Sequence, residues 1–183
     1  MYAAQYQTYY AVHLNHHTES WGAASWNKIL VTSVVDENLV QTGSTSITSS
    51  TTVSFLYPPL IQSKYYLDGV AEGHFTLYKK GTGTGWINQY SVTLLKLDEA
   101  GNYTTLASIS ETTGSITIAT LNYLTLPIYM NISQAVVNER EKLVLRIGVT
   151  CSNGTPSIGM QVSHELYSDA KDIEISLPFA PTG

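Results

Sequence analysis

Apolar and polar residues alternate along much of this chain, which is the pattern of a β-strand with one buried face. The clearest alternation covers residues 143–150. There Leu, Ile or Val at each odd-numbered position alternates with residues such as Arg146, Gly148 and Thr150 at the even-numbered positions. A second covers residues 173–179. Shorter apolar runs rich in β-branched and aromatic residues predict further strands at 26–35, 53–57, 65–80, 90–97, 103–109, 116–118 and 124–128.

The breaks between these runs carry turn signals. Asp98-Glu-Ala-Gly101 predicts a hairpin loop, because Gly supplies the positive φ that such loops need. Pro58-Pro59 ends one strand, and Gly69 and Gly73 predict a bend in the long strand at 65–80. The best helix candidate is 132–141, expected as one or two helical turns.

Eight to ten short strands with almost no helix predict an all-β fold, an antiparallel two-sheet β-sandwich of jelly-roll-like type. Residues 26–183 are expected to form this single domain. Residues 1–25 read instead as an aromatic-rich N-terminal arm or edge strand. Because aromatic residues are enriched at interfaces, its rings form the predicted subunit interface: Tyr2, Tyr6, Tyr9, Tyr10 and Trp21.

The amino-acid composition limits the classes of protein to which this chain can belong. Of 183 residues only 13% are charged and the net charge is −5, whereas 22 are Thr and 19 are Ser. The nine basic residues are not clustered, which argues against a nucleic-acid partner. The lone Cys151 excludes an intrachain disulfide and cysteine-based zinc sites. No apolar stretch reaches the roughly 20 residues of a membrane helix, and the chain starts without a signal-peptide pattern.

Few residues carry recognisable chemistry. His13, His16, His17 and Glu19 are the one cluster of metal-ligand types, but adjacent His16 and His17 would face opposite sides of a strand. The glycines of 81–85 lead into strand-like sequence rather than the helix of a phosphate loop, so a hairpin tip is expected. No Gly-x-Ser-x-Gly sequence occurs. We therefore expect no catalytic residues, no cofactor and no metal, and we expect that this protein is not an enzyme.

Aromatic strands also fit a glycan-binding surface. The segment 65–78, the Trp86 region and the strand 90–97 would suit a carbohydrate-binding sandwich, although the same rings can fill a core. Gly83 and Trp86 are the expected loop contacts to a partner. Three Asn-x-Ser/Thr sequences, at Asn102, Asn131 and Asn153, match the glycosylation acceptor pattern.

The stretch from Tyr65 to Val149, with its Asp-x-x-Gly turn and the closing strand that ends in Leu-Pro-Phe179, resembles small β-sandwich virion structural proteins of tailed viruses. The resemblance implies a capsid decoration or minor capsid protein: a homo-oligomer, often a trimer, on the virion surface, bound to a major capsid protein. It implies no catalytic residues. A carbohydrate- or receptor-binding module, located on a virion or extracellular, is the alternative. A hydrolase built around His13–Glu19 or strand-end acids is the third.

Overall fold

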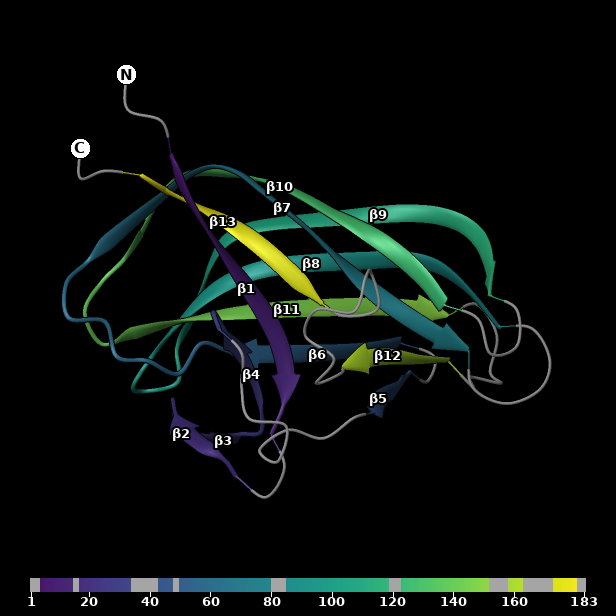
Figure 1. Cartoon of the computed structure of the whole chain (residues 1–183), viewed down its shortest axis with the longest axis horizontal. Coiled ribbons are helices and arrows are strands. Elements are labelled where there is room, and N and C mark those ends of the chain that lie inside the picture. Colours follow the sequence, from purple (N-terminus) through teal and green to yellow (C-terminus); the bar gives the residue numbers. More distant parts are fainter. Residues whose placement is uncertain are drawn as a thin grey trace.

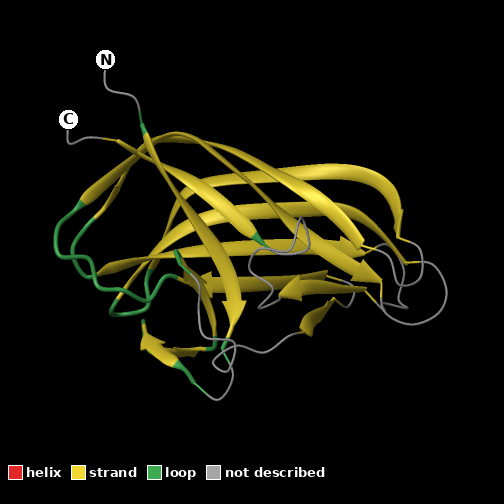
Figure 2. Cartoon of the chain, viewed as in Figure 1, coloured by secondary structure: helices red, strands yellow, loops and turns green. Residues whose placement is uncertain are grey.

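The computed structural model describes residues 4–14, 17–33, 43–47, 50–79, 85–118, 123–151, 158–162 and 173–180. Within these ranges the chain forms thirteen β-strands and no helix (Figure 2). The prediction of an all-β protein is therefore confirmed. In the same ranges, no helix is present that would be long and apolar enough to cross a membrane.

The strands differ widely in length, from three residues in the small hairpin to sixteen in β9. In chain order they are β1 Gln5–His13, β2 Glu19–Trp21, β3 Ala24–Trp26, β4 Lys28–Val31, β5 Gly43–Ile47, β6 Ser50–Leu56, β7 Tyr65–Lys79, β8 Gly85–Asp98, β9 Tyr103–Ile118, β10 Tyr123–Val137, β11 Glu141–Cys151, β12 Ile158–Val162 and β13 Glu174–Ala180.

Eleven strands join into one large sheet, and β2 pairs with β3 in a separate small one. The large sheet runs β5-β12-β7-β13-β1-β4-β6-β11-β8-β9, with β10 also paired to β7, and it curls until it is nearly barrel-shaped (Figure 1). The expected division into two separate sheets is therefore not seen. A short parallel pairing of Ile29 in β4 with Leu56 in β6 joins what would otherwise be two layers.

The aromatic N-terminal segment lies inside the large sheet. β1 pairs with β13 along Gln5–Tyr10 and with β4 along Tyr10–His13. The prediction of an arm or edge strand is thus wrong for these residues. Tyr9 and Ala11 point into the core, so burial of that face and hydrogen bonding on both sides together hold β1 in place.

The core fills the interior of the curled sheet. Phe55, Leu145 and Leu94 are direct neighbours on β6, β11 and β8, and none has exposed surface. From the other side of the interior, the ring of Phe75 on β7 meets Tyr90 edge-on, with centroids 5.3 Å apart. Every second residue of these strands faces this interior, which is why the period-two pattern located them correctly.

The expected helical turns at 132–141 are a strand and a turn instead. β10 extends to Val137 and pairs with β7, with a bulge between Ile132 and Ala135. Gln134 within the bulge has φ +44°, and Ile132 and Ala135 are both buried. The bulge places residues three apart on one face, so it reproduces the spacing of a helix in the sequence.

The hairpin predicted at Asp98–Gly101 is confirmed. β8 and β9 pair from Leu97 and Tyr103 onward, and Gly101 has φ +95°. The Asp98 carboxylate accepts hydrogen bonds from the side chain and the backbone N–H of Asn102, and these hold the pKa of Asp98 below its usual value. The turn points toward the small β2–β3 sheet, because the carbonyl oxygen of Gly22 lies 2.9 Å from where a Gly101 Cβ would be.

Candidate functional site

The β2–β3 hairpin is a separate small sheet beneath the large one (Figure 1). Its turn residues Gly22 and Ala23 have φ values of +60° and +59°, the combination of a two-residue type I′ turn. A Cβ added to Gly22 would lie 3.0 Å from the Leu97 side chain, so the turn packs tightly against the end of β8.

Two tryptophans attach the hairpin to the outer face of the large sheet. Trp26 belongs to a buried cluster with Leu56, Leu95, Leu97 and Val144, which are the outer-face residues at this end of β6, β8 and β11. The indole N–H of Trp26 donates to the Trp21 carbonyl oxygen at 3.1 Å. That of Trp21 donates to the Leu97 carbonyl oxygen at 2.8 Å. Both indoles are therefore oriented by hydrogen bonds as well as by packing.

A buried cation lies against Trp21. The Lys142 Nζ is 4.2 Å from the centroid of the indole ring and donates to the carbonyl oxygen of Pro58. Burial lowers the pKa of Lys142, while the carboxylates of Glu19 and Glu99 act in the opposite direction. Lys142 is thus held by a carbonyl oxygen and a ring face.

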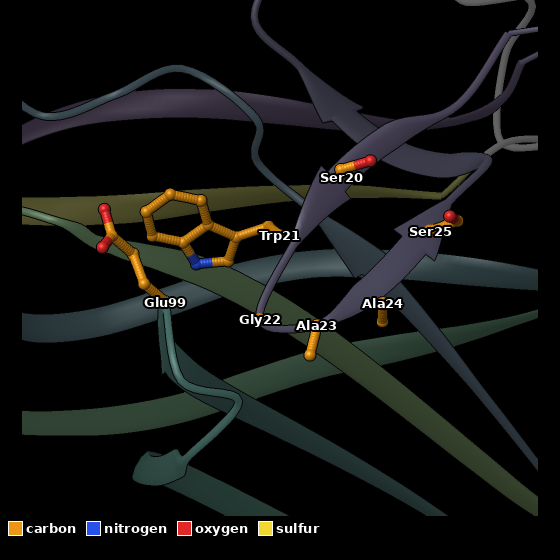
Figure 3. A pocket seen from close by; sticks show the side chains of 7 residues that line it. All are labelled: Ser20, Trp21, Gly22, Ala23, Ala24, Ser25 and Glu99. Atoms are coloured by element: carbon orange, nitrogen blue, oxygen red, sulfur yellow. The ribbon is translucent and has the colours of Figure 1, made fainter.

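An open pocket of about 450 Å³ lies beside this hairpin, lined by residues 20–25 and Glu99. Figure 3 shows the Trp21 ring and the Glu99 side chain on one side of the turn, and the Ser20 and Ser25 side chains along the two strands. Glu99 forms an ion pair with Arg140, on the neighbouring turn between β10 and β11. The pocket therefore offers an aromatic edge, hydroxyls and one carboxylate.

A second ion pair lies at the same end of the molecule. Lys96 Nζ is 3.0 Å from Glu141 Oε2 and also donates to the Val136 carbonyl oxygen at 3.0 Å. Burial alone would raise the pKa of Glu141, but hydrogen bonds from Asn138 and Lys96 hold it below its usual value. These contacts link β8 to the end of β10, two strands that are not paired in the sheet.

The described residues also contain one histidine–carboxylate pair on paired strands. His74 Nδ1 of β7 lies 3.5 Å from Glu174 Oε1 of β13, and the two residues are direct neighbours in the sheet. Such a pair is the base and orienting acid of many hydrolytic sites. The nearby hydroxyl of Ser176, however, lies 2.7 Å from the hydroxyl of Thr8 and forms its hydrogen bond there.

The structure describes only part of the histidine cluster that the sequence singled out. His17 and Glu19 form an exposed pair at 3.1 Å, whereas His13 lies on β1, where burial and then the charge of Lys28 lower its pKa. His16 lies outside the described residues. Over the ranges that the structure describes, no three His, Cys, Asp or Glu residues come close enough to hold a metal ion.

The predicted interface residues do not share one surface. Tyr6 is 57% exposed, Tyr9 is buried with its ring edge-on to Tyr57, and Tyr10 is half-buried on the opposite face of β1. Trp21 belongs to the separate small sheet and not to β1. Tyr2 lies outside the described residues.

Of the two predicted loop contacts, one lies outside the described residues and the other lies in a strand. Gly83 lies outside the described residues, and Trp86 belongs to β8. The aromatic segment 65–78 proves to be mainly β7, with Phe75 in the core and Tyr65 packed against it. Whether any of these residues contacts a partner stays a prediction.

Sequence reasoning missed Lys142, Arg140 and Arg146 as site residues. Lys142 comes just after the turn that ends β10, and its partners Trp21 and Pro58 are far away in the sequence. The one signal available in the sequence was that Lys142 directly precedes the strongly alternating strand at 143–150.

Replacing Trp21 with phenylalanine should lower the free energy of unfolding by about 1 kcal/mol, because the Leu97 carbonyl oxygen loses its indole donor. Urea unfolding followed by circular dichroism measures the change. Tyr6→Phe is the control, since this exposed side chain should be neutral. A Trp21→Phe protein as stable as the native one would contradict the role assigned to this bond.

Comparisons with known proteins identify a shared fold. No family model matches the chain, and no curated protein matches it in sequence. An α-amino acid ester hydrolase structure aligns over 94% of this chain with a TM-score of 0.60 and 8% identity. A CocE/NonD family hydrolase from Staphylococcus aureus covers 97% at 0.54 and 12% identity. An aminopeptidase from a marine sediment Thaumarchaeota archaeon covers 94% at 0.55 and 6% identity.

These alignments use only part of each hydrolase, because this chain spans 36–37% of their length. They correct the predicted function: three structures that share this fold over nearly the whole chain are hydrolases and none of the three is a virion structural protein, so the fold does not support the prediction of a non-enzymatic virion structural protein. The VP2 protein of infectious bursal disease virus aligns at a TM-score of only 0.27, too low to support an argument. Thr- and Ser-rich strands reflect a solvated sheet face and do not separate these classes.

Proposed function

We propose that this chain is the β-sheet part of a hydrolase that cleaves ester or peptide bonds. The observation that supports the proposal is the fold likeness to an ester hydrolase and an aminopeptidase across at least 94% of the chain. Because the chain has about a third of their length, the proposal makes it one part of the hydrolytic unit. The remaining groups would come from polypeptide outside the described residues.

Within this proposal the Trp21 pocket is the surface that contacts the substrate. It is open, it is built on a hairpin fixed by two indole hydrogen bonds, and its ion pair with Arg140 holds Glu99 at the rim. An indole edge, hydroxyls and a carboxylate can bind and orient a polar ligand. Among the described residues that line the pocket there is no histidine to act as a base.

The test is hydrolysis by material that contains this protein. Protein captured from its native source with an antibody against the chain should hydrolyse nitrophenyl esters or aminoacyl nitroanilides faster than a capture with non-immune antibody. The purified chain is assayed beside it, together with His74→Gln, which removes the base of the described His74–Glu174 pair. Activity lost in His74→Gln would place the chemistry in this chain. No hydrolysis by either the captured or the purified protein would refute the proposal.

A further inference from the structure

The outer face of β6, β11 and β8 carries a polar surface next to the hairpin. The register places Ser54, Arg146 and Thr93 side by side across the three strands. The residues next to these three in the sequence, such as Leu145 before Arg146, point into the core. The polar side chains of the row therefore face outward. The next row consists of Thr52, Gly148 and Ser91.

A cavity of about 240 Å³ lies where this face meets the hairpin. Residues 25–28, at the end of the hairpin and the start of β4, form its wall, and residues 52–54 of β6 form its floor. Lys28 and Asn27 belong to this wall, Trp26 at its base is buried with only 8% of its surface exposed, and among the described residues no carboxylate lines the cavity. The site is therefore a mainly polar hollow with one cationic residue, Lys28, in its lining.

Arg146 stands at the edge of this cavity in a fixed orientation. Its Nε–H donates to the Ser54 hydroxyl, a floor residue, at 3.2 Å. Its guanidinium carbon lies 4.8 Å from the centroid of the Tyr103 ring, and Tyr103 is 43% exposed. A guanidinium held by a hydrogen bond and a ring loses little further freedom when it binds an anion.

Gly148 keeps the face flat beyond Arg146. A Cβ at this position would lie 2.7 Å from the Ser91 hydroxyl and 3.6 Å from the Thr52 hydroxyl, so both hydroxyls border an area without a side chain. On the other side of the row, the hydroxyls of Thr93 and Ser108 are 3.3 Å apart. The face thus presents hydroxyl groups on both sides of the guanidinium.

Charge and chemistry together indicate the ligand. Lys28 lines the cavity and Arg146 donates to Ser54, another lining residue, so two cationic residues border the cavity in a chain whose net charge is −5. Serine and threonine hydroxyls exchange hydrogen bonds with sugar hydroxyls, and a guanidinium forms its strongest hydrogen bonds with carboxylates. An exposed tyrosine ring offers an apolar surface to a sugar ring.

We propose that this face binds an acidic oligosaccharide, with a uronate carboxylate on Arg146 and Lys28 and neighbouring sugar hydroxyls on the serine and threonine rows. The inference is independent of the proposed hydrolase, because none of its residues lines the Trp21 pocket except Ser25, at the shared edge of the two cavities.

The test is a binding titration of the purified chain with a hyaluronan hexasaccharide, which carries uronates, and with neutral chitohexaose, followed by calorimetry and tryptophan fluorescence. Hyaluronan should bind, and rising salt should weaken binding. Arg146→Gln should weaken it at least about tenfold, because a charge-assisted hydrogen bond is lost. Arg140→Gln is the matched control: it removes an arginine that is 73% exposed and paired with Glu99, and should change affinity less than about twofold.

Thermal unfolding of both variants establishes that they are folded, and Lys28→Gln provides a second variant on the same face. Binding of chitohexaose with equal affinity would overturn the assignment of an acidic ligand. Absence of hyaluronan binding, or equal weakening by Arg146→Gln and Arg140→Gln, would overturn the site. None of these outcomes bears on the proposed hydrolysis of esters or peptides.

Discussion

Replacing Gly73 with alanine should destabilise the protein by about 3 kcal/mol. Gly73 lies in β7 between β10 and β13, and its Cβ would be 2.1 Å from the carbonyl oxygen of Glu174 and 2.8 Å from the Ile175 Cα. Both are main-chain atoms of a paired strand, so no side-chain rotation can make room. For a domain of this size the loss corresponds to a fall of roughly 6–12 °C in Tm.

Gly148→Ala is the matched control. Its Cβ also meets a close neighbour, at 2.7 Å, but that neighbour is the Ser91 hydroxyl, which can rotate away. The expected cost is less than about 1 kcal/mol. Thermal and urea unfolding of the two variants give the comparison. If both glycines tolerate alanine equally, the close approach of β7 and β13 is not as described.

Above about pH 10 the stability of the protein should fall steeply. Burial raises the pKa values of the Tyr9 and Tyr65 hydroxyls far above their usual value of 10.0, and neighbouring tyrosines add to the shift. The unfolded chain therefore releases protons near pH 10 that the folded chain keeps. Stability that is complete below pH 10 is lost as the pH rises, at about 1.4 kcal/mol per pH unit for each tyrosine.

Two such tyrosines give a slope of about 2.7 kcal/mol per pH unit, and Tyr90, whose pKa burial also raises, adds to it. Lys142 acts in the opposite direction, since its lowered pKa favours the folded state as pH rises, but only up to about pH 10.5. Urea unfolding between about pH 9 and pH 11.5 measures the slope.

Tyr65→Phe isolates one contribution. The Tyr65 hydroxyl is buried and has no hydrogen-bond partner among the described residues, so its removal should cost little at neutral pH. Above pH 10 the variant should lose stability about 1.4 kcal/mol per pH unit less steeply than the native protein. Equal slopes would show that Tyr65 titrates normally in the folded state. Tyr6→Phe, at an exposed position, is measured beside it as the control.

The candidate sites were harder to predict than the strands. The Trp21 site joins residues 21, 97 and 142, and the Arg146 site joins residues from β3, β4, β6 and β11. A sequence pattern reports which face of a strand a residue occupies, but not which strands lie next to each other. For this reason Trp21 was predicted as part of an arm, although it lies over a buried lysine.

The expected function failed for a related reason. The abundance of serine and threonine describes solvated strand faces, and solvated faces occur in virion proteins and in hydrolases alike. The path of the strands in space carries the information that composition lacks: it aligns this chain with hydrolase structures at TM-scores of 0.54–0.60.

By itself, the sequence determined the all-β class, the strands at 143–150 and 173–179, and the Asp98–Gly101 turn, because period-two burial and positive φ are local requirements. The tertiary structure alone decided that β1 lies between β13 and β4, that a bulge turns an apparent helix into the end of β10, and that the two layers join through Ile29 and Leu56. Each of these depends on pairing between residues distant in the chain. Such pairing is selected by the burial of the whole sheet, not by any one segment of it.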